Sequence, residues 1–497
     1  MRVSNPVDGA PVPEAGSRTV VAARNAAVRG VAELLGKVAT LVLMVVAARS
    51  LGEAGFGVFS FALALALLLA SVPAGGFTTV LVQRASADLT RLPGLMARVL
   101  VLMTLLALPV FVLVGGAAAV ARPTREGGIA VGLLMVAVLL ELWGDVLRAG
   151  AQALQRQAGV SAALVVQRLV TTTVVCVLLA LGGGVVALCG GYLLGSAIGL
   201  VAFAVAAHRA GVRVDRARPS RGELSELARS SFAIGVDSIV SMALFRLDAV
   251  LLGLFAGDRA VGHYSAAYRF LETVLFLTWV VNSAVFPSVS ADPEPWRVRR
   301  SVDTGLAAIA TVYVPFGVLL LLRPDDLLRL LYTEDFVRDG ALVLQLLAGA
   351  PLAFALGYLC SYALLARERR GHVLAASCIA AGVNIAANLA LIPVFGASGA
   401  AAATTGSYLL EAVVLVVWLR REVGLQVQQV LRPLLVPVLA TVPLAAVLLT
   451  GAPLLAAVAV GAVAYTVSWL LLAVRLAPEP VALLRGMLPG RARGEQA

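Results

Sequence analysis

Long apolar runs, separated by short polar segments, dominate the pattern of this chain. A run of about 20 apolar residues is long enough to cross the hydrocarbon core of a bilayer as a helix. The expected runs cover residues 26–49, 56–82, 96–121, 128–150, 160–182, 185–207, 231–256, 264–287, 303–322, 341–366, 372–393, 398–419, 433–450 and 453–474. The pattern therefore predicts an all-α polytopic membrane protein with about 14 transmembrane helices.

Four prolines fall inside these runs, namely Pro73, Pro109, Pro315 and Pro351. Proline removes a backbone donor, so each should kink or break its helix where neighbouring helices can satisfy the freed carbonyl.

One short polar turn occurs twice. Gly52–Ala62 (GEAGFGVFSFA) returns as Gly257–Ala267 (GDRAVGHYSAA), and Gly190–Leu194 (GGYLL) returns as Gly406–Leu410 (GSYLL). The two pairs are offset by 205 and 216 residues. Such similar offsets indicate an internal duplication, which is typical of transporters. Six spans, an even number, separate the paired turns, so both copies should have the same orientation in the membrane. The pattern therefore predicts two six-helix lobes. Their pseudo-two-fold axis should run along the membrane normal, with two further helices at the C-terminus.

This duplication sets the expected domain organisation. The expected parts are a disordered cytoplasmic tail (1–18), an N-lobe (19–207), a cytoplasmic linker (208–230), a C-lobe (231–420), two further helices (421–476) and a cytoplasmic tail (477–497).

Composition agrees with a membrane protein, because 60% of the residues are hydrophobic and only 13% are charged. The net charge of +11 would suit nucleic acid, but the basic residues lie in short loops between apolar runs. Their concentration in the tails, and in the loops after even-numbered spans, predicts cytoplasmic termini and a cytoplasmic 208–230 linker. Ser220 and Glu223 have capping-box spacing, so a short surface helix is expected to begin there. All four Cys lie in apolar runs and predict neither a metal site nor a disulfide.

Ionisable side chains within the runs are few, and each is costly in hydrocarbon unless it faces a cavity or a partner. We expect a basic and amide set to bind substrate: Lys37, Arg168, Arg246, Arg269, Asn384 and Asn388. We expect a set of carboxylates to couple transport to an ion: Glu141, Asp145, Asp248, Glu272 and Glu411. Arg246 and Asp248 lie about 200° apart on a helix and cannot pair along it.

Each set has a structural alternative. Arg269 lies near a helix end and can snorkel to the interface. Asn384 and Asn388 can serve as hydrogen-bonding contacts between helices. Glu141 and Asp145 are one turn apart, so either basic neighbours pair them or one of them is protonated.

Three segments resemble a known family. Ala48–Ser60 (ARSLGEAGFGVFS), Arg246–Glu272 and Asn384–Thr404 (NIAANLALIPVFGASGAAAAT) are similar to the polysaccharide flippases of the multidrug/oligosaccharidyl-lipid/polysaccharide exporter superfamily. The resemblance covers nearly all of residues 20–475. It implies a non-enzymatic carrier in the bacterial inner membrane that turns undecaprenyl-pyrophosphate-linked oligosaccharide across the bilayer for O-antigen, capsule or exopolysaccharide synthesis.

The same resemblance implies membrane lipids, a polysaccharide polymerase and chain-length regulators as partners, with no nucleic acid. No cofactor is expected beyond a coupling H⁺ or Na⁺. A lipid II flippase and a cation-coupled drug exporter of the same superfamily are the alternatives. A membrane glycosyltransferase is disfavoured because no external loop exceeds about 20 residues, too short for a catalytic domain.

Overall fold

The computed structural model describes residues 15–215 and 218–476, with side chains in the first helix from Leu35 onward, and it is built almost wholly of helices. The first half comprises α1 (Ala15–Ala74), α2 (Phe77–Ala87), η1 (Leu89–Arg91), α3 (Leu92–Pro109), η2 (Val110–Gly115), α4 (Gly116–Ala121), α5 (Arg125–Ala153), α6 (Ala158–Ala180) and α7 (Val185–Arg209). The second half comprises α8 (Arg221–Phe255), α9 (Gly257–Ala291), α10 (Pro295–Leu322), α11 (Pro324–Leu331), α12 (Glu334–Leu346), α13 (Ala350–Ala366), α14 (Arg370–Val423), α15 (Val427–Leu448) and α16 (Leu454–Leu476).

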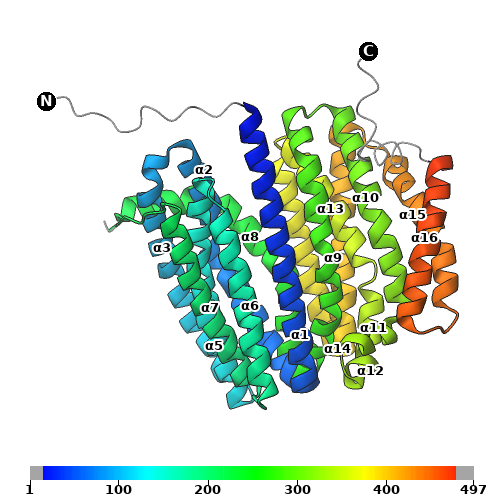
Figure 1. Cartoon of the computed structure of the whole chain (residues 1–497), viewed down its shortest axis with the longest axis horizontal. Coiled ribbons are helices and arrows are strands. Elements are labelled where there is room, and N and C mark those ends of the chain that lie inside the picture. Colours follow the sequence, from blue (N-terminus) through cyan, green and yellow to red (C-terminus); the bar gives the residue numbers. More distant parts are fainter. Residues whose placement is uncertain (1–14, 216–217, 477–497) are drawn as a thin grey trace.

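The helices form two groups. Figure 1 shows α2, α3, α5, α6 and α7 on one side, and α9, α10, α13 and α14 on the other. Helix α1 packs against α5 and α6 of the first group and against α9 of the second, so it joins the groups. The C-terminal pair α15 and α16 lies at the outer edge, where α15 packs on α10. The all-α, two-lobed fold class expected from the repeat is confirmed.

Within the described residues, 11 helical segments are long and apolar enough to cross a membrane. Two of them contain an internal break, at Gly52 (φ 68°) and at Gly396 (φ 55°). Each break falls between two expected spans, at a backbone conformation that favours glycine. Helix α9 is not among the 11, so the count of about 14 spans stays a prediction.

Prolines mark a helix boundary at three of the four expected places. Helix α1 ends one residue after Pro73, a π-helical stretch follows Pro109, and Pro351 lies in the first turn of α13. Helix α10 continues through Pro315.

The connections differ from expectation in three places. Helix α1 begins at Ala15, so residues 15–18 are helical; the remaining tail residues, 1–14 and 477–497, lie outside the described part. The capping box at Ser220 is present, but it starts α8 itself, so the second half of the 208–230 linker belongs to a spanning helix. The segment 323–340, which falls between the expected runs 303–322 and 341–366, holds α11 and the start of α12.

The two copies of the repeated turn meet in space. A Cβ atom placed on Gly57 would lie 1.7 Å from the backbone oxygen of Asp258. A Cβ atom on Gly262, the equivalent residue of the second copy, would lie 2.2 Å from the backbone oxygen of Glu53. The contact is therefore reciprocal, as an internal two-fold predicts, and it brings α1 and α9 together at one end of the molecule.

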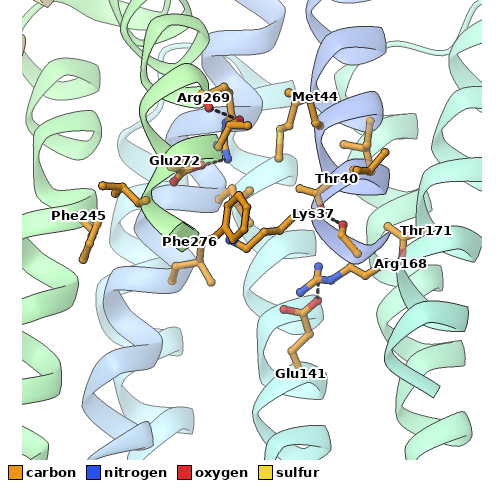
Figure 2. A pocket seen from close by; sticks show the side chains of 18 of the residues that line it. Lys37, Thr40, Met44, Glu141, Arg168, Thr171, Phe245, Arg269, Glu272 and Phe276 are labelled. Atoms are coloured by element: carbon orange, nitrogen blue, oxygen red, sulfur yellow. Dashed lines mark hydrogen bonds and ion pairs between the residues drawn. The ribbon is translucent and has the colours of Figure 1, made fainter. Parts of the chain in front are cut away.

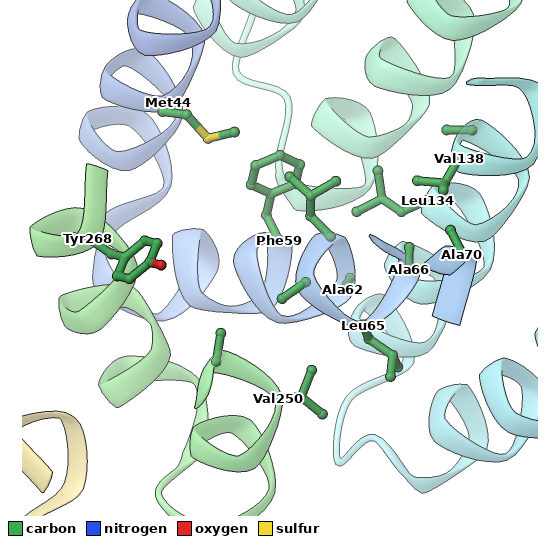
Figure 3. Packing of buried hydrophobic residues seen from close by; sticks show 14 of the residues in the cluster. Met44, Phe59, Ala62, Leu65, Ala66, Ala70, Leu134, Val138, Val250 and Tyr268 are labelled. Carbon is green, nitrogen blue, oxygen red and sulfur yellow. The ribbon is translucent and has the colours of Figure 1, made fainter. Parts of the chain in front are cut away.

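A continuous apolar core supports this contact. Figure 3 shows Phe59 and Ala66 of α1 packed beside Leu134 and Val138 of α5, with Val250 of α8 on another side. These residues are buried at 6% exposure or less, and the same cluster includes Tyr268 of α9. The core therefore extends from one lobe into the other and fixes the walls of the cavity described next.

Candidate functional site

A cavity of about 740 Å³ lies between the lobes. Helices α1, α5, α6 and α7 line one side of it, and α8 and α9 line the other (Figure 2). Its charged lining residues are Lys37, Arg148, Arg168, Arg246, Arg269, Glu141 and Glu272. Four predicted substrate-binding residues therefore line one cavity, namely Lys37, Arg168, Arg246 and Arg269.

Glu141 and Arg168 form the polar part of the N-lobe wall. Arg168 Nη1 lies 3.9 Å from Glu141 Oε1, which is a loose ion pair. The same oxygen accepts hydrogen bonds from Gln167, Tyr192 and Ser196, each at 3.3 Å. Of the two structural alternatives for Glu141, pairing with a basic neighbour is the one observed.

Glu272 organises the C-lobe wall. Arg246 Nη1 lies 2.9 Å from Glu272 Oε1, and Arg269 Nη1 donates to Glu272 Oε2 at 2.5 Å. Two cations share one carboxylate, and the Nε–H of each arginine is buried with no acceptor among the described residues. The Arg269 side chain is 13% exposed, so it does not snorkel to the interface. This wall therefore keeps spare positive charge and spare N–H donors.

Lys37 is held by a ring instead of a carboxylate. Its Nζ lies 5.0 Å from the centroid of Trp279, within the range of a cation–π contact. Among side chains that the structure describes, no carboxylate lies within 4.0 Å of it. Figure 2 shows Lys37 between the Arg168–Glu141 pair and the Arg269–Glu272 pair. Five cations and two carboxylates line the cavity, so it is positive overall.

Asp248 lies away from the cavity, in a buried polar network. It accepts hydrogen bonds from Tyr264 at 2.8 Å, from Asn388 at 2.6 Å and from Thr404. Asp248 and Asn384 are each 1% exposed and Asn388 is fully buried. As the helical geometry predicted, Asp248 does not face Arg246.

The same network contains the two asparagines that were expected to bind substrate. Asn384 and Asn388 do not line the cavity, and Asn388 Nδ2 also contacts Asn384 Oδ1 at 3.0 Å. Their positions agree with the structural alternative, because Asn388 of α14 donates a hydrogen bond to Asp248 of α8. Hydropathy locates a polar residue along its helix but leaves open the direction in which its side chain points, so a role of the two asparagines in substrate binding stays a prediction.

The other two carboxylates have local partners. Asp145 pairs with Arg148 one turn away on α5. Glu411 accepts a hydrogen bond from Ser377 at 2.8 Å within α14. Both stay predictions as ion-coupling residues.

The repeated turns carry a charged cluster that the sequence analysis did not assign. Glu53 lies 2.9 Å from Arg259 and 2.7 Å from His263, both of α9. Asp258, the equivalent of Glu53, pairs with Arg122 of the N-lobe. A signal was present, because an acid follows the first glycine in both copies of the turn. These pairs connect the two lobes where the turns meet.

The chain is thus a membrane protein in which two helical lobes enclose a cavity of about 740 Å³ lined by apolar and charged side chains. A family model described as "Polysaccharide biosynthesis protein" matches residues 22–291, more than half of the 497 residues. The chain belongs to this family, which confirms the resemblance noted in the sequence.

Two curated relatives come from the archaeon Haloferax volcanii. The "Probable low-salt glycan biosynthesis flippase Agl15" is 26% identical over 210 residues, which is 40% of this chain and 44% of that protein. The "Probable flippase AglR" is 29% identical over 186 residues, which is 36% of this chain and 39% of that protein. The chain therefore spans less than half the length of either relative.

Solved transporters share the fold. The lipid II flippase MurJ in an inward closed conformation superposes with a TM-score of 0.75 at 14% identity, covering 90% of this chain and 99% of that one. An inward-facing multidrug resistance transporter of the MATE family, in the MOP superfamily, gives a TM-score of 0.55 at 14% identity, covering 78% and 94%. These likenesses show that the chain has the MOP transporter fold.

Proposed function

We propose that this protein is a flippase that carries undecaprenyl-pyrophosphate-linked oligosaccharide across the bacterial inner membrane by alternating access. The observation that carries the proposal is the positive cavity between the lobes, lined by Lys37, Arg168 and Arg246. Membership of the polysaccharide biosynthesis family supports it, as do the flippase names of the two relatives.

The lining suits a diphosphate. A diphosphate entering hydrocarbon needs compensating positive charge, and the planar guanidinium fork matches phosphate oxygens in a bidentate contact. Arg246 and Arg269 share the single carboxylate of Glu272, so this wall keeps positive charge that a diphosphate can neutralise. The polyprenyl tail can stay in the surrounding lipid, and no bond is made or broken in the carrier.

The charge balance also sorts the alternatives. A cation-coupled drug exporter would bring a cationic substrate into a cavity with more cations than carboxylates, which is unfavourable. A lipid II flippase shares the diphosphate chemistry, so it stays the second candidate; the MurJ likeness favours it at the level of the fold. A polymerase and chain-length regulators remain the proposed partners.

Arg246 is the residue that tests the proposal. We expect Arg246→Ala to abolish surface glycan in a flippase-deficient strain and to let the lipid-linked precursor accumulate, while the protein level stays normal. Arg246→Lys should restore only part, because a point charge replaces a bidentate fork. Arg370→Ala is the matched control, since Arg370 is exposed at the start of α14. Full complementation by Arg246→Ala would remove Arg246 from the substrate path.

We also propose Asp248 as the residue that couples transport to Na⁺ or H⁺. Hard cations prefer oxygen ligands, and Asp248 is surrounded by Tyr264, Thr404 and Asn388. Asn388 Oδ1 is buried and has no donor among the described residues, so it is a spare acceptor beside the carboxylate. These groups fit a small cation.

Flipping in proteoliposomes, driven separately by a Na⁺ gradient and by a pH gradient, tests this coupling. We expect one gradient to accelerate the wild type and Asp248→Asn to abolish that acceleration. Glu411→Gln is the comparison, because Glu411 is the other predicted ion-coupling carboxylate that has no ion pair with a basic side chain in the described part of the chain. An undiminished gradient response in Asp248→Asn would rule the coupling role out.

A further inference from the structure

A second cavity, of about 360 Å³, adjoins the main one in the N-lobe. It is formed by α2, the last turns of α5 and the first turns of α6. Arg148 and Leu164 line both cavities, so the two are neighbours. Figure 1 shows α2 at the end of the molecule where α1 begins, opposite the end where α11 and α12 lie.

The lining of this second cavity is polar but neutral. Hydroxyl and amide groups come from Thr78, Thr79, Gln83, Gln152, Gln157 and Ser161. Its only charges are Asp145 and Arg148, which pair with each other. None of the three glutamine side chains has a hydrogen-bond partner among the described residues, so each keeps a free donor and a free acceptor.

The two cavities therefore differ in what they can hold. The main cavity has excess positive charge, whereas the second offers neutral groups that donate and accept at once. A sugar hydroxyl also donates and accepts, so an amide-lined cavity is its natural complement. A diphosphate would gain little there, and a polyprenyl chain would leave the amides without partners.

Helix α5 runs along both cavities, so a diphosphate-linked glycan lying along this helix can reach from one cavity into the other. It presents Glu141 to the main cavity, Arg148 to both and Gln152 to the second. At about 1.5 Å per residue, Gln152 lies roughly 16 Å along the axis from Glu141. A diphosphate beside Arg168 and Lys37 would thus place an attached glycan toward Gln152.

We propose that the second cavity is the glycan subsite of the carrier, with Gln83, Gln152 and Gln157 as its hydrogen-bonding groups. The proposal rests on the proposed function, and it moves sugar recognition from the C-lobe asparagines to the N-lobe.

Binding of three probes to the purified full chain in detergent tests it. The probes are undecaprenyl diphosphate without sugar, with one hexose, and with a hexose tetrasaccharide. We expect the wild type to bind the tetrasaccharide lipid about tenfold more tightly than the bare lipid, the size of effect that two net hydrogen bonds give. Gln83→Leu combined with Gln152→Leu should lose that gain, so that all three probes bind alike. Arg246→Ala should weaken binding of all three.

The controls distinguish a failure of the glycan subsite from a failure of the proposed flippase function. Gln428→Leu changes an exposed glutamine of α15 and should keep the gain, and Gln157→Leu alone should lose part of it if the double variant misfolds. The glycan subsite is overturned if both subsite variants still bind the tetrasaccharide lipid more tightly than the bare lipid, or if the wild type binds the three probes equally. Either result leaves the proposed flippase function standing. A wild type that binds none of the probes overturns the carrier as well.

Discussion

At the scale of single residues, the closest approach of the lobes depends on two glycines. Alanine at Gly57 would set a Cβ atom 1.7 Å from the backbone oxygen of Asp258, and that oxygen cannot move without α9. We expect Gly57→Ala to open this end of the cavity, so that a cysteine placed at the buried Ser60 reacts faster with a water-soluble thiol reagent. Gly132→Ala is the control, because nothing lies within 4 Å of its Cβ position. Equal labelling rates in both variants would contradict the closed contact.

Glu272 gives a second prediction at this scale. Glu272→Gln would leave Arg246 and Arg269 without their shared counter-charge, which should destabilise the protein by about 2 kcal/mol. Fully buried pairs typically cost about 3–5 kcal/mol to break, and Glu272 is partly exposed. The measurement is thermal unfolding of the purified variant. Adding Arg269→Gln should recover part of the loss, because it removes one of the uncompensated cations; a further loss in the double variant would argue against the shared pair.

The residues of the site show what the sequence could predict. Charge in an apolar run is costly enough to imply a cavity, and Lys37, Arg168, Arg246 and Arg269 do line one. Which side chains contact each other could not be predicted from the sequence, because hydrogen-bond partners such as Asp248 and Thr404 are 156 residues apart. Neither could the neutral second cavity, since uncharged glutamines near helix ends carry no signal by themselves.

At the scale of helices, the contact between α1 and α9 is testable by crosslinking. Ser60 and Ser265 are equivalent residues of the repeated turns, and both line a cavity of only about 20 Å³ between the lobes. In a background without the four native cysteines, a disulfide between Ser60→Cys and Ser265→Cys should hold this end closed and stop flipping. Reduction should restore it. Sustained flipping in the crosslinked protein would mean that the two helices do not separate during transport.

Helix boundaries were well predicted where proline or glycine marks them. The breaks at Gly52 and Gly396 fall between expected spans, and Pro351 begins α13. The boundary of α8 was missed because a polar segment at a membrane surface can be loop or helix. The capping box at Ser220 starts a helix there, and the apolar run that follows allows the same helix to continue across the membrane.

At the scale of the whole molecule, orientation remains to be tested. The basic residues predict that the linker between α7 and α8 is cytoplasmic. Cysteine at Arg218, which is exposed, should react with an impermeant reagent only after the cells are opened. Arg218 is preferable to Ser220, whose side chain caps α8. Labelling in intact cells would invert the topology.

Helix α8 has one more consequence for the molecule. It contains no proline and runs for 35 residues, roughly 52 Å at the usual rise. Arg246, in the second half of the helix, faces the cavity, while near the N-terminal end Glu223 and Glu226 pair with Arg98 and Arg84 of the N-lobe. A stiff rod anchored at both ends transmits displacement instead of absorbing it. A head group that pulls on Arg246 therefore also strains the ion pairs of Glu223 and Glu226. Salt weakens such surface pairs, so the ionic strength outside the membrane should change the affinity for a ligand bound deep inside it.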